Sequence, residues 1–410
     1  MGVSRRADAG KRARAGRPSG GRAPGGGARG PRGIPAGRRA TRAGALVPRV
    51  LVLAGALALV LLAGPAGATS LKTDATKALV PLEEIISGGP PPDGIPAIDR
   101  PVFVAFAAAD RWLGAREPVL ALEVGGEARA YPLQILMWHE IVNDTVGGRP
   151  VVATYCPLCN SGLVYDRVVD GRPLDFGTSG MLYKSDLVMY DRQTHSLWAQ
   201  MEGRAIVGAR AGARLASLPA NTIAYGEFKA IYPRGVVLSR ETGHARAYGK
   251  NPYAGYDQPD SPPFLFRGPL DARRPPKERV VGVVVAGVAR AYPWPAVAKR
   301  GVVHDTIEGE RLVVLHRPGA LSALDASTIA DSRAIGATAV FSPVVDGAAL
   351  TLEPTPDGFR DRQTGSAWTL LGHAVRGPLA GKRLRPIAHV DAFWFAWAAF
   401  HPSTALWAPP

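Results

Sequence analysis

Residues 127–132 read EARAYP and residues 288–293 read VARAYP, and this pair of segments decides the fold predicted for the chain. Further on, DRQTHSLW at 191–198 returns as DRQTGSAW at 361–368. The offset between the matching segments is 161 residues for the first pair and 170 for the second. Self-similarity at a nearly constant spacing is typical of a repeated structural unit. The sequence therefore predicts two homologous halves.

Each half is dominated by short strand-like segments that are separated by glycine turns. Residues 119–124 and 127–131 flank one Gly-Gly pair, and residues 141–146 and 150–155 flank another. Two apolar runs joined by two glycines are typical of a β-hairpin, because glycine accepts the positive φ angles of the tight turn. We therefore expect two successive hairpins in the first half.

A predicted helix closes each half, over residues 223–232 and 390–400, before a proline that cannot continue it. The predicted fold is mainly β (α+β): a duplicated β-rich unit with a helix closing each half, forming one pseudo-symmetric two-lobed domain. The expected order is a leader with a secretory signal (1–68), a lead-in linker (69–104), the first repeat (105–235), a connector (236–277) and a second, degenerate repeat (278–403).

The net charge of +15 is concentrated in the leader. Residues 1–68 hold 13 Lys and Arg but one acid, Asp8, which leaves about +3 for the rest of the chain. An apolar run at 50–63 and the small residues 66–68 follow the basic segment, as in a secretory signal. We therefore expect an exported protein, periplasmic or extracellular, that contacts a membrane only through this signal and is anchored there if the signal is not cleaved. Nucleic acid is excluded as a partner, because the basic residues belong to the leader.

The chain has two cysteines, Cys156 and Cys159, within the stretch VVATYCPLCNSGLV at 151–164. At an offset of 161 they fall on Arg317 and Ala320, so the second half lacks both thiols. The scaffold residues are duplicated and the reactive ones are not. This difference favours a chemical role for the cysteines.

Two chemistries fit a Cys-x-x-Cys pair in this setting. One is thiol redox chemistry, in which Cys156 is the exposed attacking thiolate and Cys159 resolves the mixed disulfide. The other is a soft-metal site, because thiolate and thioether ligands select copper in its Cu(I) state. His139, Met181 and Met189 are the predicted further ligands. His139 is alternatively a proton carrier, and we expect Glu140 to orient it.

The alternative is a non-enzymatic secreted binding or structural protein, in which Cys156–Cys159 is a structural disulfide that pins the loop. A structural zinc site is not favoured, because zinc usually takes four protein ligands and no second cysteine pair exists. Asp186, Asp191 and Arg192 form a charged patch, whose Asp191-Arg192 pair is predicted to be a structural ion pair or turn because it recurs at 361–362. His195 is predicted to be a turn residue. The residues leave open whether the protein is an enzyme and whether its partner is a small molecule, a metal or an extracytoplasmic protein.

A set of motifs in fixed order resembles the exported prokaryotic family catalogued as domain of unknown function 3179. The resemblance covers roughly residues 95–405 and rests on YP at 131–132, HEIVND at 139–144, TYCPLC at 154–159, SGMLY at 179–183, LVMYDR at 187–192 and SLWAQ at 196–200. It implies secretion, and it brings no established activity.

Overall fold

The structure is a computed structural model that describes residues 70–409. The predicted leader, 1–68, lies outside the described residues, and so does the apolar run at 50–63. No helix within residues 70–409 is long and apolar enough to cross a membrane.

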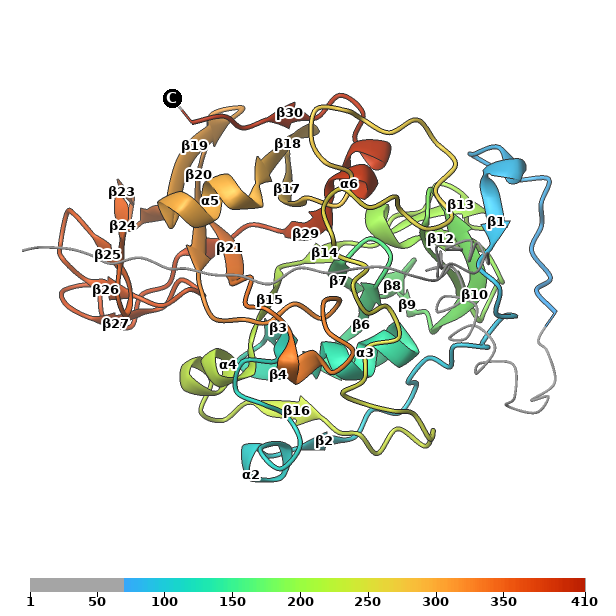
Figure 1. Cartoon of the computed structure of the whole chain (residues 1–410), viewed down its shortest axis with the longest axis horizontal. Coiled ribbons are helices and arrows are strands. Elements are labelled where there is room, and N and C mark those ends of the chain that lie inside the picture. Colours follow the sequence, from blue (N-terminus) through green and yellow to red (C-terminus); the bar gives the residue numbers. More distant parts are fainter. Residues whose placement is uncertain (1–69, 410) are drawn as a thin grey trace, which may run out of the picture. The chain divides into compact units, whose positions relative to one another are not determined.

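The described chain is mainly β, as predicted, with short helices between groups of strands (Figure 1). The first half contains β3 (Pro118–Val124), β4 (Glu127–Pro132), α3 (Leu133–His139), β5 (Ile141–Val146), β6 (Arg149–Cys156), β7 (Ser161–Asp166), β10 (Phe176–Tyr183), β11 (Asp186–Asp191), β12 (Leu197–Ala199), β13 (Arg204–Val207), β14 (Ser217–Leu218), β15 (Ala220–Ala224) and α4 (Tyr225–Ile231). Two short edge strands, β1 (Ile85–Ser87) and β2 (Phe103–Val104), precede them, and β16 (Val236–Leu238) follows.

The second half presents corresponding elements in the same order. They are β17 (Arg279–Val285), β18 (Val288–Pro293), α5 (Trp294–Arg300), β19 (Val302–Ile307), β20 (Glu310–Arg317), β21 (Ala337–Ser342), β24 (Leu352–Thr355), β25 (Gly358–Asp361), β26 (Ala367–Trp368), β27 (Ala374–Arg376), β28 (Arg385–Pro386), β29 (His389–Phe393), α6 (Trp394–Phe400) and β30 (Ala405–Leu406). Both predicted hairpins of the first half are confirmed, since β3 pairs with β4 and β5 pairs with β6, antiparallel in each case.

The order of the strands within the sheets also recurs. The first half has the orders β15-β3-β4-β16 and β14-β7-β6-β5, and the second half has β29-β17-β18-β30 and β28-β21-β20-β19. Contacts cross between the halves in a reciprocal way, because β15 touches β21 while β29 touches β7. Recurrence of elements and neighbours is thus a property of the structure, whereas a pseudo-symmetric arrangement of two lobes and the exact repeat boundaries stay predictions.

The closing helices are shorter than predicted. Residues 223–224 belong to β15 and residues 390–393 to β29, so that α4 and α6 begin at Tyr225 and Trp394. Every residue of β29 is buried, because this strand pairs with β17 and also packs against β7. A strand that is buried on both faces lacks the alternation of apolar and polar residues that marks a half-buried strand, so it is hard to distinguish from a buried helix in sequence.

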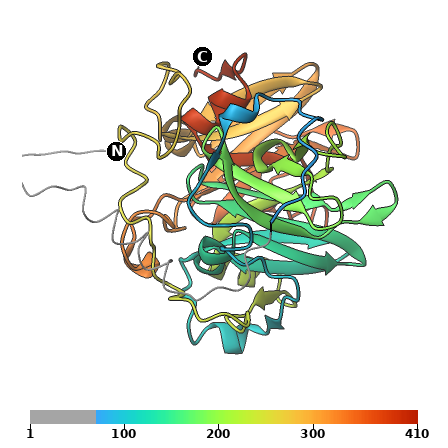
Figure 2. The ribbon, with the colours of Figure 1, turned by 90° about the vertical axis from the view of Figure 1, so that its right-hand side faces the viewer.

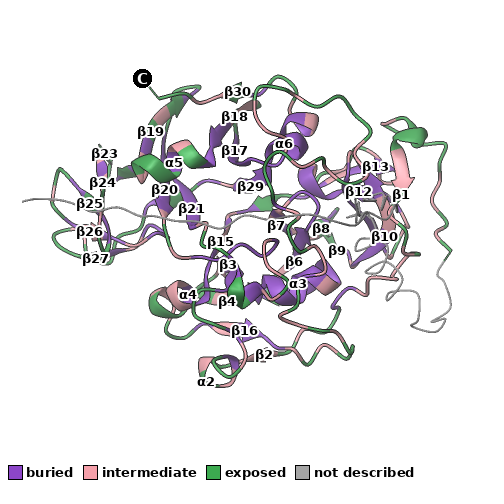
Figure 3. Cartoon of the chain, viewed as in Figure 1, coloured by how far each residue is buried: buried purple, intermediate pink, exposed green. Residues whose placement is uncertain are grey.

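The same buried side-chain motif occurs once in each half, at equivalent positions. The Asp191 carboxylate accepts hydrogen bonds from the Thr194 N–H at 2.6 Å and from the Trp198 indole N–H at 2.9 Å. Asp361 makes the same bonds at the same distances. Both tryptophans are buried, and Figure 3 shows in purple how the buried residues are distributed over the strands. The duplicated Asp-Arg-Gln-Thr segment is therefore a structural turn, and His195 lies in that turn with a φ of 56°.

The connector between the halves is mostly irregular after β16 and runs along the outside of the strands (yellow in Figure 2). A buried ion group fastens it to the second half. The Asp257 carboxylate, which is fully buried, accepts hydrogen bonds from the Arg279 guanidinium at 2.7 Å and from the Ser322 hydroxyl at 2.5 Å. Arg333 adds an ion pair at 2.7 Å. Charges buried this deeply are stable only when paired, so this group fixes the course of the connector.

Candidate functional site

The two cysteines lie at a tight connection between β6 and β7. Cys156 is the last residue of β6 and pairs with Ser161, the first residue of β7. The four residues between them turn back at Asn160, which has a φ of 54°, and the Asn160 N–H donates to the Pro157 carbonyl at 3.3 Å. Asparagine tolerates this left-handed conformation better than most residues. The cysteines are therefore carried by a strand and a turn, with no helix N-terminus after them.

Asp186 comes to the cysteines from a different hairpin. It is the first residue of β11, directly after a turn in which Lys184 and Ser185 have φ angles of 54° and 65°. The ligand atoms of Cys156, Cys159 and Asp186 all lie within 4.8 Å of one another, and the two cysteines are 3.8 Å apart. Both cysteines are free thiols. Two sulfurs and one carboxylate oxygen at this spacing make a cluster that can hold a metal ion.

The hydrogen bonding of Asp186 is incomplete. Its Oδ2 accepts the Met201 N–H at 2.8 Å, but its Oδ1 is buried and has no partner of normal geometry. Burial raises the pKa of this carboxyl to about 7, although the Met201 N–H acts in the opposite direction. A buried carboxylate oxygen without a donor is costly, and either protonation or a bound cation would remove that cost.

The thiols are held in the neutral form as well. Burial raises the pKa of Cys156 above its usual value, and it raises the pKa of Cys159 further still. The sulfur of Cys159 donates to the Ser185 carbonyl oxygen at 3.5 Å. A thiolate is therefore not the resting state of either residue. A bound cation would reverse this preference, because a metal ion deprotonates the thiols that coordinate it.

Glu140 lies beside this cluster. It follows α3 with a φ of 59°, and its carbonyl oxygen accepts the Tyr155 N–H at 2.8 Å, next to Cys156. Burial raises the pKa of the Glu140 carboxyl to about 8, and the negative charge of Asp186 acts in the same direction. Within residues 70–409 no group donates a hydrogen bond to this carboxyl. The expected contact in which Glu140 orients His139 is not formed, and the charge of Glu140 acts instead on the Cys156 thiol, whose pKa it raises.

His139 is not brought into the cluster. Its Nδ1 lies 2.7 Å from the Pro96 carbonyl oxygen and its Nε2 lies 2.6 Å from the Tyr248 hydroxyl, so both ring nitrogens are engaged. Burial lowers the pKa of His139 to about 4, which keeps the ring neutral. The ring joins α3 to the connector, and its predicted roles as a metal ligand and proton carrier find no support in this geometry.

The two candidate methionines lie on β10 and β11. Side chains alternate along a strand, so Met189 points to the face of β11 opposite to Asp186. Met181 is the cross-strand partner of Val188 and therefore shares the face of Asp186. Of the two predicted thioether ligands, only Met181 is on the correct side of the sheet.

The second half of the chain and the connector close the site. The Phe393 N–H donates to the Cys159 carbonyl oxygen at 2.9 Å, and the Ser185 hydroxyl donates to the Phe264 carbonyl oxygen at 2.6 Å. Tyr256 packs against Phe393 with ring centroids 6.0 Å apart. Cys156 is consequently 2% exposed, and the prediction that it is the exposed thiolate is wrong. Residues distant in sequence cover it, which local sequence could not reveal.

Asp186 is the site residue that sequence reasoning missed, because it was grouped with Asp191 and Arg192 as a structural charged patch. One signal was available. At the offset of 170 that relates this part of the two halves, Asp186 falls on Pro356, whereas Asp191 falls on Asp361. The second half therefore has no acidic counterpart of Asp186, just as it has no counterpart of the two cysteines.

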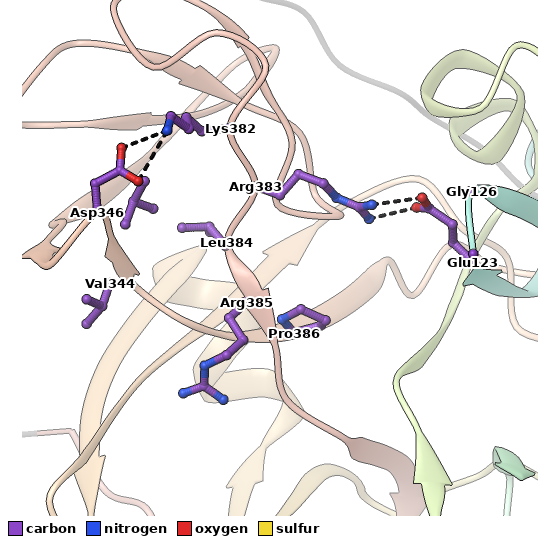
Figure 4. Close-up of a pocket in the computed structure, with 11 residues that line it drawn as sticks. Glu123, Gly126, Val344, Asp346, Lys382, Arg383, Leu384, Arg385 and Pro386 are labelled. Carbon is purple, nitrogen blue, oxygen red and sulfur yellow. Dashed lines mark hydrogen bonds and ion pairs between the residues drawn. The ribbon is translucent and has the colours of Figure 1, made fainter.

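A surface hollow occurs elsewhere, between the start of the first half and the end of the second (Figure 4). Its cations are already paired, because Lys382 contacts Asp346 at 2.9 Å and Arg383 makes two bonds to Glu123 at 2.7 and 2.8 Å. None of the predicted site residues lines it. One of these ion pairs, Arg383 with Glu123, joins the two halves, and the cysteine cluster remains the better candidate site.

The fold and the site together define a class: mainly β proteins with a buried cluster of two thiols and a carboxylate that can hold a metal ion. The chain belongs to the family described as "Protein of unknown function (DUF3179)", which it matches over residues 92–404. The resemblance identified from the motifs is thereby confirmed. No curated protein and no solved structure matches the chain.

Proposed function

We propose that this is an exported metal-binding protein whose centre is formed by Cys156, Cys159 and Asp186. The observation that carries the proposal is the unpartnered Oδ1 of Asp186, which is buried beside two free thiols. A cation is the group that would satisfy all three side chains together. Buried charges of one sign are otherwise avoided, because their desolvation is not offset by any partner.

Copper in its Cu(I) state is the ion that the two thiols favour most. Two thiolates are soft ligands, and soft ligands select Cu(I) over harder ions. The side chains Cys156 and Cys159 would hold the ion from the β6–β7 turn, and Asp186 would contribute an oxygen from β11. Export is proposed from the leader at 1–68, whose basic segment, apolar run and small-residue site have the order of a secretory signal.

Thiol redox chemistry is the second candidate, supported by the 3.8 Å spacing of the cysteines. In this reaction the two thiols lose two protons and two electrons to an external disulfide, which is reduced to two thiols, and one sulfur–sulfur bond forms within the pair. Asp186 would accept a proton from a thiol. The burial of both sulfurs favours the metal proposal, since an ion reaches a closed site more easily than a protein disulfide does. A structural disulfide would require this same oxidation.

Metal analysis by mass spectrometry, on protein exported by its native host, tests the proposal. We expect about one copper ion per chain in the wild type and none in the Cys156→Ser/Cys159→Ser variant, with circular dichroism showing that the variant is folded. Wild-type protein that contains no metal and binds none on titration with Cu(I) would overturn the metal proposal. If in that case the thiols form a reversible disulfide under a glutathione buffer, the redox candidate takes its place.

A further inference from the structure

We infer that Glu140 is a fourth ligand of this centre, and that it gives the site affinity for a divalent ion such as Zn²⁺. The inference rests on the proposed metal centre and adds to it the residue that determines which ion is bound. Three independent features of Glu140 support it: its position, its backbone conformation and its unpartnered side chain.

The position of Glu140 is fixed by the strand that carries the cysteines. Its carbonyl oxygen accepts the Tyr155 N–H at 2.8 Å, so its backbone lies beside the residue that precedes Cys156. The side chain is close enough for its charge to act on the Cys156 thiol and on the Tyr253 hydroxyl, raising the pKa of both groups. In this structure the Glu140 carboxylate stands outside the group of three that lies within 4.8 Å. The inference therefore requires the Glu140 side chain to turn toward the ion when the ion binds.

The backbone conformation of Glu140 is one that ordinarily favours glycine. The residue ends α3 with a φ of 59°, and its counterpart Gly301 ends α5 with a φ of 71°. Both residues donate their N–H to the helix, to the Leu136 carbonyl oxygen in one half and to that of Val297 in the other. Glycine is the usual residue at such a helix end, because any other side chain is strained there. The first half therefore keeps a strained glutamate where the second half has the relaxed residue, and strain of this kind is typical of functional sites.

The side chain of Glu140 is buried without a partner. It is 8% exposed and accepts no hydrogen bond from any residue between 70 and 409. The nearby Asp186 Oδ1 is buried and lacks a hydrogen-bond partner, although Asp186 Oδ2 accepts the Met201 N–H. A cation with four ligands would bind both carboxylates together with the two thiols.

The ligand set indicates the kind of ion. Zn²⁺ takes four ligands in a tetrahedral arrangement and accepts sulfur and carboxylate oxygen together. The sequence had disfavoured zinc because four ligands could not be found, and Asp186 with Glu140 removes that objection. Cu(I) depends mainly on thiolates, so a carboxylate contributes little to its binding. Glu140 is thus expected to determine selectivity rather than binding as such.

Titration of Zn²⁺ and Cu(I) into metal-free wild type, Glu140→Gln and Glu140→Gly tests the inference. We expect both variants to bind Zn²⁺ about tenfold or more weakly and to keep Cu(I) affinity within about threefold. Glu140→Gly should also raise the melting temperature of the metal-free protein, because it removes the strained conformation. Gly301→Ala is the matched control, whose Cβ would lie 2.9 Å from Pro354. It should lower the melting temperature and leave both affinities unchanged.

Equal Zn²⁺ affinity in wild type and Glu140→Gln would overturn the inference and leave the metal centre intact. An equal loss of both ions would also overturn it, because Glu140 would then not discriminate between them. Failure of the wild type to bind either ion would reject the metal centre itself, and that outcome is distinct from the other two.

Discussion

The backbone N–H of Phe393, in the second half of the chain, donates a 2.9 Å hydrogen bond to the carbonyl oxygen of Cys159 in the first half. The half that lacks cysteines therefore takes part in the site by closing it. The ring of Phe393 is fully buried and contacts Tyr256 of the connector, so three parts of the chain meet at this turn.

Removal of the Phe393 ring should open the site. Phe393→Ala is expected to lower the free energy of unfolding by about 3–5 kcal/mol and to increase the alkylation rate of the two thiols. Mass spectrometry after timed treatment with iodoacetamide measures that rate. Phe359→Ala removes a similarly buried ring on β25 and serves as the control. A comparable loss of stability without faster alkylation is expected there, and faster alkylation in both variants would mean that general destabilisation exposes the thiols.

Asp186→Asn should weaken metal binding about tenfold or more while the protein remains folded. The amide oxygen of asparagine can still accept the Met201 N–H, so the hydrogen bond at 2.8 Å is retained. What is lost is the negative charge that a cation would need. Competition titration against a chelator of known affinity measures the change. Unaltered affinity would exclude Asp186 from the centre.

The buried carboxyl of Asp391 should make stability fall as the pH rises. Burial raises its pKa from the ordinary 3.8 to about 7, against the opposing effect of the Thr338 hydroxyl. The folded protein therefore holds a proton that the unfolded chain releases between these two values, so the contribution of this carboxyl to stability is fully present below pH 3.8 and is lost by about pH 7. Asp391→Asn removes this contribution, and its oxygen can still accept the Thr338 O–H. The difference in unfolding free energy between Asp391→Asn and the wild type should increase from pH 3.8 to about pH 7 and stay constant at higher pH. Urea titrations measure this difference.

The duplicated turns should be equivalent in stability and irrelevant to the metal. Asp191→Ala and Asp361→Ala each leave a buried tryptophan N–H without an acceptor, and each should cost about 1–3 kcal/mol of unfolding free energy. Chemical denaturation measures both. The metal affinity of each folded variant should match that of the wild type. A selective loss of metal in Asp191→Ala would show that this turn belongs to the centre.

The sequence was informative about the fold wherever structure is local. The hairpins of the first half follow from glycine pairs between β-branched runs, and such turns depend on neighbouring residues alone. The starts of the closing helices were misplaced, because residues 390–393 show no alternation of buried and exposed positions: every residue of β29 is buried, since β29 pairs with β17 and packs against β7 of the other half.

The residues of the candidate site also fall into two groups: those that the sequence identifies and those that only tertiary packing brings together. Cys156 and Cys159 were found because they are chemically rare and absent from the second half. Asp186 was missed because only the packing of two hairpins brings it to the cysteines. His139 was predicted as a ligand from its proximity in sequence, yet its nitrogens are used by Pro96 and Tyr248, which lie 43 and 109 residues away along the chain.

The loop that follows β20 determines what would be needed to build a second metal centre in the second half of the chain. Four residues, 157–160, join β6 to β7, whereas residues 318–336 occupy the same place between β20 and β21. Cys156 matches Arg317, but the predicted match of Cys159 with Ala320 does not hold, because the longer loop diverges before that point. Two cysteine substitutions would therefore not create a second centre. An engineer would have to excise most of that loop, rebuild the short turn and supply an acid in place of Pro356.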